Sequence, residues 1–204
     1  MKSRKLFKVC ALLMLAVMSC LLFSGCGGQS EQKKFVITYL PNESTDKNAD
    51  ARKGMAGDLS KVLGMEVTEL VSNDYNAVIE AMRTGKADMA YFGPLSFCLA
   101  YERAGAEPIG MIAKDKDKKN ATYKSVLVTS SKNTDINSIQ DIKGKTMAFV
   151  DPNSTSGNLI PSAAIMKAFP GEKLSMDDLH TNGKFFQAVS FSGKHQAGLA
   201  AVVK

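Results

Sequence analysis

Short apolar runs alternate with longer segments whose apolar residues fall at helical spacing, from residue 35 to the end of the chain. Strands are expected at residues 35–40, 66–71, 88–92, 108–113, 123–129, 146–150 and 185–191. Helices are expected at residues 49–63, 75–83, 96–104, 139–143 and 158–168, and residues 192–204 are expected to be a turn followed by a helix. Strands that alternate with helices of this length form a parallel sheet covered by helices on both faces. The pattern therefore predicts an α/β fold, with ligands at the carboxyl ends of the strands.

A run of mixed charge, Lys114 to Lys119 (KDKDKK), interrupts this alternation in the middle of the chain. It has no apolar face to bury, so we interpret it as a solvated connector. The alternation restarts after it, which predicts a first lobe at residues 35–119 and a second at residues 120–204. The chain stops inside its last predicted helix.

The first residues have the features of an export signal. Four basic residues come first, namely Lys2, Arg4, Lys5 and Lys8. The apolar run 9–23 that follows is shorter than the roughly 20 residues that a membrane-spanning helix needs. Residues 1–25 are therefore expected to be a signal peptide. The small residues before Cys26 resemble the lipobox of bacterial lipoproteins, although Phe23 stands where Leu is usual.

In that interpretation Cys26 becomes the lipidated first residue of the mature protein, and residues 26–34 form a polar tether. An uncleaved anchor or a conventional cleavage site is the alternative. Of the other cysteines, Cys10 and Cys20 lie in the signal, which leaves Cys98 and no intramolecular disulfide. Cys98 lies in an apolar stretch and is expected to be a small buried residue.

The net charge argues against nucleic acid as a partner. The chain has 26 basic and 20 acidic residues, a formal charge of +6. Four of the basic residues and none of the acidic ones belong to the signal, so the rest carries almost balanced charge. The two histidines, His180 and His195, are not paired at a metal-binding spacing, so neither a zinc site nor a cofactor is expected.

The segment Asp151 to Pro161 (DPNSTSGNLIP) carries the most informative chemistry. Ser154, Thr155 and Ser156 precede a predicted helix, so their hydroxyls and the N–H groups of the first helical turn can converge on an anion. The alternative is a capping turn in which one hydroxyl satisfies the helix and the others are solvated. The segment has no Walker-type pattern, so it gives no support to nucleotide hydrolysis.

Two further segments contribute candidate residues. His195 stands at the predicted start of the last helix, where it either donates to an anion or is an ordinary polar residue. Tyr91 and Phe92 end the third strand, so their rings and Ser96 can line a ligand pocket, with one of the rings packed in the core. His180 is assigned no role.

Three segments together carry a family resemblance: DYNAVIEAMRTGKADMAYFGPLSF (74–97), DPNSTSGNLIP (151–161) and SGKHQAGLAAV (192–202). In order and spacing they resemble the phosphate/phosphite/phosphonate-binding proteins of ABC transporters. The resemblance implies a type II periplasmic-binding-protein fold, in which two α/β lobes with parallel-rich sheets close on a small oxyanion. It also implies a solute-binding component rather than an enzyme, with a membrane permease as partner. Together with the lipidated Cys26 expected from the signal, it places the protein on the extracytoplasmic face of the cell membrane, held there by its lipid.

The resemblance assigns roles to individual residues. Ser154, Thr155 and Ser156 match the ligands of the phosphonate oxygens, and His195 matches an anion-contacting histidine. Phe92, next to Tyr91, stands where some relatives place a tyrosine hydroxyl, which removes one hydrogen bond. Members of the family are longer, so the chain is expected to be truncated at its C-terminus, with an incomplete second lobe. A product of this length is then expected to aggregate or to melt weakly, and not to bind anions tightly on its own.

Two other functions remain open at this point. One is an exported hydrolase that uses Ser154 or Ser156 with His195, although no Gly-x-Ser-x-Gly elbow is present. The other is a related bilobal binder of a different solute, such as a thiamine precursor. Turnover of a phosphate ester would favour the hydrolase, and a gene neighbourhood without permease and ATPase genes would favour the other binder.

Overall fold

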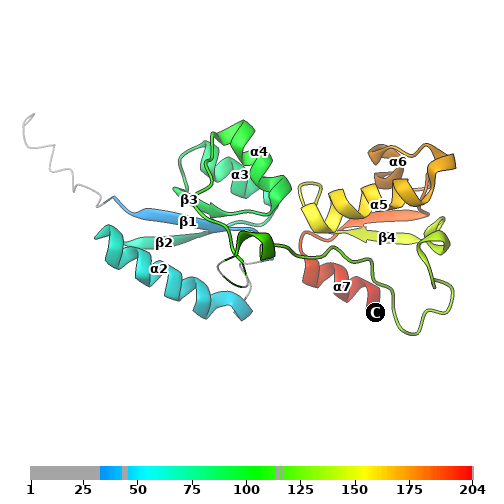
Figure 1. Ribbon diagram of the computed structural model, residues 1–204, viewed down its shortest axis with the longest axis horizontal. Coiled ribbons are helices and arrows are strands. Elements are labelled where there is room, and N and C mark those ends of the chain that lie inside the picture. The colour runs from blue at the N-terminus through cyan, green and yellow to red at the C-terminus, as the bar shows by residue number, and fades with distance from the viewer. Residues whose placement is uncertain (1–32, 43–45, 114, 116, 204) are drawn as a thin grey trace, which may run out of the picture. The chain divides into compact units, whose positions relative to one another are not determined.

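The computed structural model describes residues 33–42, 46–113, 115 and 117–203. Two parallel sheets organise these residues, one with the strand order β2-β1-β3 and one with the order β4-β5 (Figure 1). The predicted signal peptide 1–25, Cys26 and the tether up to residue 32 lie outside the described residues.

The first sheet has β1 (Phe35–Tyr39) at its centre, between β2 (Val67–Val71) and β3 (Met89–Tyr91). Both neighbours run parallel to β1, with Phe35 opposite Val67 and Ile37 opposite Met89. A central strand is covered on both faces, and its last three residues are buried accordingly. The three strands expected in this part of the chain are confirmed.

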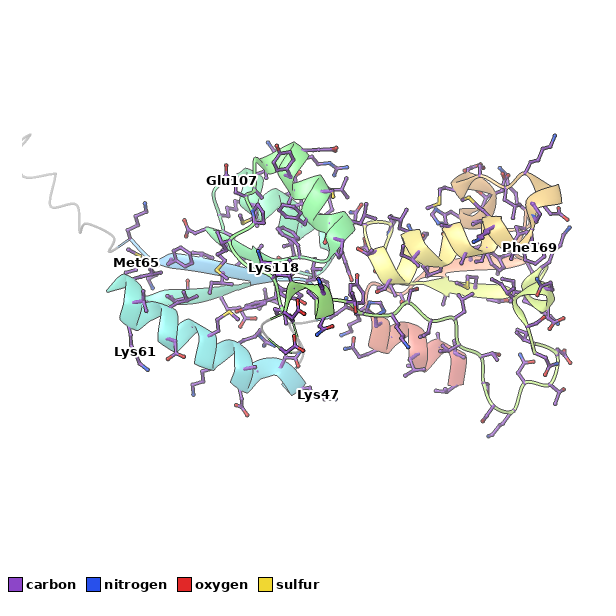
Figure 2. All side chains as sticks on the ribbon, in the orientation of Figure 1. Lys47, Lys61, Met65, Glu107, Lys118 and Phe169 are labelled. Atoms are coloured by element: carbon purple, nitrogen blue, oxygen red, sulfur yellow. The ribbon has the colours of Figure 1, made fainter. Side chains whose placement is uncertain are left out.

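Helices cover both faces of this sheet. Figure 1 shows α2 (Ala49–Leu63) on one side and α3 (Tyr75–Arg83) and α4 (Pro94–Ala104) on the other. Gly64 ends α2 in the left-handed conformation, with φ 65°. A short 3₁₀ turn, η1 (Asp46–Asn48), precedes α2. Figure 2 shows Lys61 projecting from α2 on the side away from the sheet.

Two expected strands are wrong. Residues 108–113 and 123–129 form no strand, and Ile109 and Val126 in them are 82% and 69% exposed. Their β-branched and aromatic residues predict strands from composition, but a strand forms only where a second strand pairs with it. Among the described residues neither segment pairs with one. The connector between them contains a 3₁₀ turn, η2 (Lys118–Asn120).

The second sheet pairs β4 (Thr146–Phe149) with β5 (Ala188–Phe191), with Phe149 opposite Phe191. Its core is largely aromatic and contains Phe149, Ile165, Leu179, Phe185 and Phe186. β5 begins three residues later than expected, because Phe185 and Phe186 are buried in the core ahead of the strand.

Helices flank this sheet as well. Figure 1 shows α5 (Ile160–Ala168) and α6 (Met176–His180) on one side and α7 (His195–Val203) on the other. The expected helix at 139–143 is a 3₁₀ helix, η3 (Ile139–Ile142), and a further 3₁₀ turn, η5 (Pro170–Glu172), follows α5. The helix α6 was not expected.

The expectation that Cys98 is buried is wrong. Ser96 and Ala100 are fully buried on the inner face of α4, and Cys98 lies between them in sequence and is exposed. Successive residues of a helix are about 100° apart. Cys98 is two positions from Ser96 and from Ala100, so it lies on the opposite side of the helix. Cys98 is free of any disulfide. Within the described residues no helix is long and apolar enough to span a membrane.

Candidate anion-binding site

The candidate motif forms a turn that joins β4 to α5. The Asp151 carboxylate accepts a hydrogen bond from the Asn153 N–H at 2.8 Å, and the Ser154 N–H donates to the Asp151 carbonyl at 2.9 Å. The Ser154 hydroxyl then accepts from the Gly157 N–H at 3.1 Å. This cap starts a π-helical turn, η4 (Thr155–Leu159), that continues into α5.

Ser154 is therefore the capping hydroxyl of the motif, and only 2% of it is exposed. Thr155 and Ser156 are half-buried and follow in the first turn. A ligand role for any of the three stays a prediction. Thr155 and Ser156 are the two whose exposure suits it.

Gly157 lets the turn lie directly against the end of β4. A Cβ at this position would come within 2.3 Å of Val150 Cγ2 and 2.4 Å of Val150 Cβ. The same two residues are joined by a hydrogen bond of 3.0 Å from the Val150 N–H to the Gly157 carbonyl. Glycine is required here for this close approach and not for a special backbone angle.

Thr155 connects the motif to the first turn of α4. Its hydroxyl accepts a hydrogen bond of 2.9 Å from the N–H of Leu95, which lies 60 residues earlier in the chain. The Leu95 N–H is one of the groups that an α-helix leaves without a partner of its own. The N-terminal ends of α4 and of η4 therefore meet at Thr155, and both ends carry partial positive charge.

Further hydroxyls gather around Gly93, the residue before α4. A Cβ on Gly93 would lie 3.4 Å from Thr155 Oγ1, 3.8 Å from Tyr123 Oη and 3.9 Å from Ser96 Oγ. The Ser96 hydroxyl also accepts from the Gly93 N–H at 3.0 Å. Glycine thus keeps the space between these hydroxyls free of a side chain.

A hollow of about 260 Å³ opens beside these groups. Its lining consists of Tyr123, Ser125, Thr155, Ser156 and Ile160. The Ser125 hydroxyl donates to the Ser156 carbonyl at 2.7 Å, which ties the segment at 123–129 to the motif. Because the lining offers hydroxyls and no charged side chain, it suits an anion held by neutral donors at helix N-termini.

A larger hollow of about 460 Å³ lies along the connector. Met111, Ile112, Ala113, Asp115 and Lys118 line it. Its lining contains no hydroxyl and no helix N-terminus of the kind found around Thr155. We therefore locate the candidate site at the smaller hollow.

His195 begins α7 and is exposed. Its backbone N–H donates to the side-chain carbonyl of Asn42 at 2.8 Å, so the start of α7 lies beside the loop that follows β1. This contact joins segments 153 residues apart. A role of the His195 ring in anion binding stays a prediction.

Phe92 and Tyr91 are both half-buried. Phe92 packs against two buried clusters, one around Tyr75 and Val78 and one around Ile79 and Ala100. Phe92 is thus a packing residue at the end of the first sheet. A ligand-lining role for it or for Tyr91 stays a prediction.

Sequence reasoning missed two hydroxyls of the hollow, those of Tyr123 and Ser125. Both belong to a segment predicted as a strand, and hydroxyl residues at alternate positions of a strand are ordinary. Their place beside Thr155 depends on a contact that spans 31 residues, which no local pattern reveals.

His180 also has a role that the sequence did not indicate. Its Nε2 lies 2.7 Å from the Asn158 side-chain oxygen, and the Asn158 amide donates to the Pro152 carbonyl at 2.9 Å. The ring packs edge-on against Phe149 and Phe191. Burial lowers the pKa of His180, which favours the neutral ring. Through Asn158 this ring is connected to the Ser154 motif.

Parallel sheets under helices, with hydroxyls and helix N-termini gathered beyond the strand ends, have the architecture of the type II periplasmic-binding-protein fold. The chain belongs to the family described as ABC transporter, phosphonate, periplasmic substrate-binding protein, which residues 37–204 match. The expected family and the expected α/β fold class are confirmed.

Individual relatives agree with this assignment. The chain is 31% identical over 157 residues to the phosphate-import protein PhnD of Mycolicibacterium smegmatis, covering 72% of this chain and 49% of the relative. It is 31% identical over 204 residues to a probable ABC transporter phosphite binding protein, PhnD1, of Prochlorococcus marinus, covering 97% of this chain and 62% of the relative.

A solved structure supports the fold. This chain is similar to a binding protein component of an ABC phosphonate transporter from Pseudomonas aeruginosa, with a TM-score of 0.66 and 25% identity. The match covers 84% of this chain and 54% of the Pseudomonas chain. The chain thus spans between 49% and 62% of the length of these three proteins.

Proposed function

We propose that this chain binds a small tetrahedral oxyanion of the phosphonate, phosphite or phosphate class as the solute-binding component of an ABC importer. The observation that carries the proposal is the contact between Thr155 and the Leu95 N–H, because it joins two helix N-termini among several hydroxyls. Backbone N–H groups and hydroxyls at a helix N-terminus are a common arrangement for phosphate-like anions. The bound anion is then passed to a membrane permease.

Thr155 and Ser156 are the principal side-chain donors in this proposal, with Tyr123 at the mouth of the hollow. Ser154 holds the turn on which they lie, and its hydroxyl contributes less to the affinity for the anion than theirs do. His195 closes the site from the start of α7. Tyr91 and Phe92 form the apolar wall.

Binding without chemistry is favoured over hydrolysis. A nucleophilic serine needs a hydroxyl that a base can deprotonate. The Ser154 hydroxyl accepts from the Gly157 N–H and is 2% exposed, so it is engaged in holding the turn. The names of the relatives describe import and binding proteins, which agrees with a transport role.

The organisation of the whole chain is part of the proposal. Residues 1–25 are a signal peptide, Cys26 carries the lipid, and residues 26–34 are the tether. Residues 35–119 belong to the first lobe and residues 120–204 to the second. The protein is held on the extracytoplasmic face of the membrane by its lipid.

Calorimetry on the full chain tests the proposal, with methylphosphonate, phosphite, phosphate and, as a comparison anion, sulfate. A hydrogen bond to a charged group contributes roughly 1.5–3 kcal/mol. Thr155→Ala and Ser156→Ala are therefore expected to weaken binding by about one to two decades. Thr84→Ala, which removes an exposed hydroxyl that bonds the Glu80 carbonyl at the end of α3, is the matched control.

Unchanged affinity in both Thr155→Ala and Ser156→Ala would remove the motif from the site. Absence of binding for every phosphorus oxyanion, in a sample that is monomeric and melts cooperatively, would reject the function itself. Turnover of a phosphate ester by the wild type would favour the hydrolase.

A further inference from the structure

Asn42 joins two elements that are distant in sequence. Its side-chain amide donates a hydrogen bond to the Tyr75 hydroxyl, and its side-chain carbonyl accepts from the His195 N–H at 2.8 Å. Asn42 lies just after β1, Tyr75 is the first residue of α3, and His195 is the first residue of α7. One side chain therefore connects the first sheet and its helix α3 to the start of α7.

Tyr75 extends this connection to the Ser154 motif. Tyr75 belongs to the same buried cluster as Val150, the residue directly before Asp151. Tyr75 is 3% exposed, and burial raises the pKa of its hydroxyl and that of the Asp151 carboxyl. The Ser154 hydroxyl, which accepts from the Gly157 N–H, lies close enough to the Tyr75 hydroxyl to lower its pKa against this effect of burial, and the Tyr75 backbone lowers the pKa of Asp151 in the same way.

We propose that Asn42 and Tyr75 are positioning residues that hold the Ser154 turn and the start of α7 in a single arrangement. The inference rests on the proposed function, because it concerns the same anion site. We do not propose that either residue contacts the anion. Asn42 is hydrogen-bonded to Tyr75 and to the start of α7, and Tyr75 packs in the cluster next to the Ser154 turn, so the pair links the two segments.

A purely apolar role for Tyr75 is the competing explanation. Its ring packs with Leu40, Val78 and Val150 in a buried cluster. Tyr75→Phe keeps this packing and removes only the hydroxyl, so it separates the two explanations. Asn42→Ala removes the amide that donates to the Tyr75 hydroxyl. Because Asn42 is only half-buried, this variant tests the same contact even if Tyr75→Phe fails to fold.

The first experiment measures methylphosphonate affinity and the unfolding midpoint for the full chain, its two single variants and the double variant. Each single variant is expected to weaken binding about tenfold, the effect of one net hydrogen bond. The double variant is expected to bind no more than slightly weaker than either single variant, because both remove one connected network. Tyr101→Phe is the matched control, since Tyr101 lies on α4 and is 61% exposed.

The second experiment follows backbone amide resonances without any ligand. The Gly157 amide reports the Ser154 cap and the His195 amide reports the Asn42 contact. Tyr75→Phe is expected to shift both resonances, although Tyr75 has no direct bond to either amide. If Tyr75 only contributed to overall stability, the shifts would not be concentrated at these two amides.

Several results would overturn the inference. Wild-type affinity in both single variants, or a lower midpoint with unchanged affinity, would show that the pair stabilises the fold without positioning the site. Additive losses in the double variant would show two independent residues. Absence of binding by the wild type would instead reject the proposed function, and this inference with it.

Discussion

Hydroxyl side chains at the strand ends do two different things in this molecule. Ser154 and Ser96 satisfy N–H groups within their own turns, at 3.1 Å and 3.0 Å. Thr155 instead satisfies an N–H of a distant helix. The first kind fixes the local backbone, and the second brings two helix N-termini together. The proposed binding surface therefore depends on a backbone that holds Thr155 in contact with α4.

Gly157 provides the sharpest test of that local packing. Gly157→Ala would place a methyl group against Val150, within 2.3 Å of its Cγ2, so one of the two must move. Overpacking of this kind costs about 1–3 kcal/mol of unfolding free energy. Chemical denaturation is expected to show that loss, together with weaker binding of methylphosphonate because the Thr155 turn is displaced.

Gly54→Ala is the control for this substitution. Gly54 lies inside α2, and nothing lies within 4 Å of a Cβ there. Alanine is favoured over glycine in a helix interior by about 1 kcal/mol, so this variant is expected to be more stable than the wild type. Equal stability of the wild type and Gly157→Ala would show that the turn is not packed as described.

At this scale the sequence indicates only those candidate residues that have a local signature. The hydroxyls of Ser154, Thr155 and Ser156 stand next to one another before a helix, which indicates a capping or anion-binding turn without any knowledge of the fold. Asn42 and Tyr75 have no such signature. The role that we propose for them depends on the contact of Asn42 with Tyr75 and with the start of α7, which only the folded chain brings near.

Helices were predicted better than strands because their ends are encoded locally. The bounds of α2 and α3 agree with the expected 49–63 and 75–83, where Gly64 ends one helix and Asp74 begins the other. The segments 108–113 and 123–129 have strand-forming composition and are not strands. Helical hydrogen bonds form within a segment, whereas a strand depends on a partner elsewhere in the chain.

The start of α3 makes this local encoding testable. The Asp74 carboxylate accepts from the Ala77 N–H at 2.8 Å and caps the helix. Asp74→Ala is expected to lower the unfolding free energy by about 1 kcal/mol, which is typical of a lost N-cap. It is also expected to loosen Tyr75, the next residue, and so to weaken anion binding slightly.

Asp58→Ala serves as the comparison for that change. Asp58 pairs with Lys61 on α2, and both side chains are 80% exposed. Exposed pairs contribute between about 0 and 1 kcal/mol, so little loss is expected. If thermal or chemical unfolding showed the same loss for both aspartates, the cap would have no particular importance.

For the whole molecule, the comparisons establish the family, and the balanced charge outside the predicted signal agrees with a partner other than nucleic acid. The residues that match the family, 37–204, are not those on which the proposed membrane attachment rests. The family is described as periplasmic, while the proposed attachment by a lipid rests on the residues around Cys26. Fold and attachment are therefore tested by separate experiments.

The last prediction concerns attachment of the full chain through Cys26. The apolar run 9–23 and the small residues before Cys26 favour cleavage at that cysteine followed by lipid modification. A single acyl chain anchors a protein only marginally, so stable membrane attachment requires more than one. Metabolic labelling with a fatty acid is expected to mark the wild type and Cys98→Ala equally and to leave Cys26→Ala unmarked. Because Cys98 is exposed, it is the appropriate control for incidental acylation of a thiol. Labelling of Cys26→Ala at the wild-type level would disprove the anchor and leave the fold and the binding site unaffected.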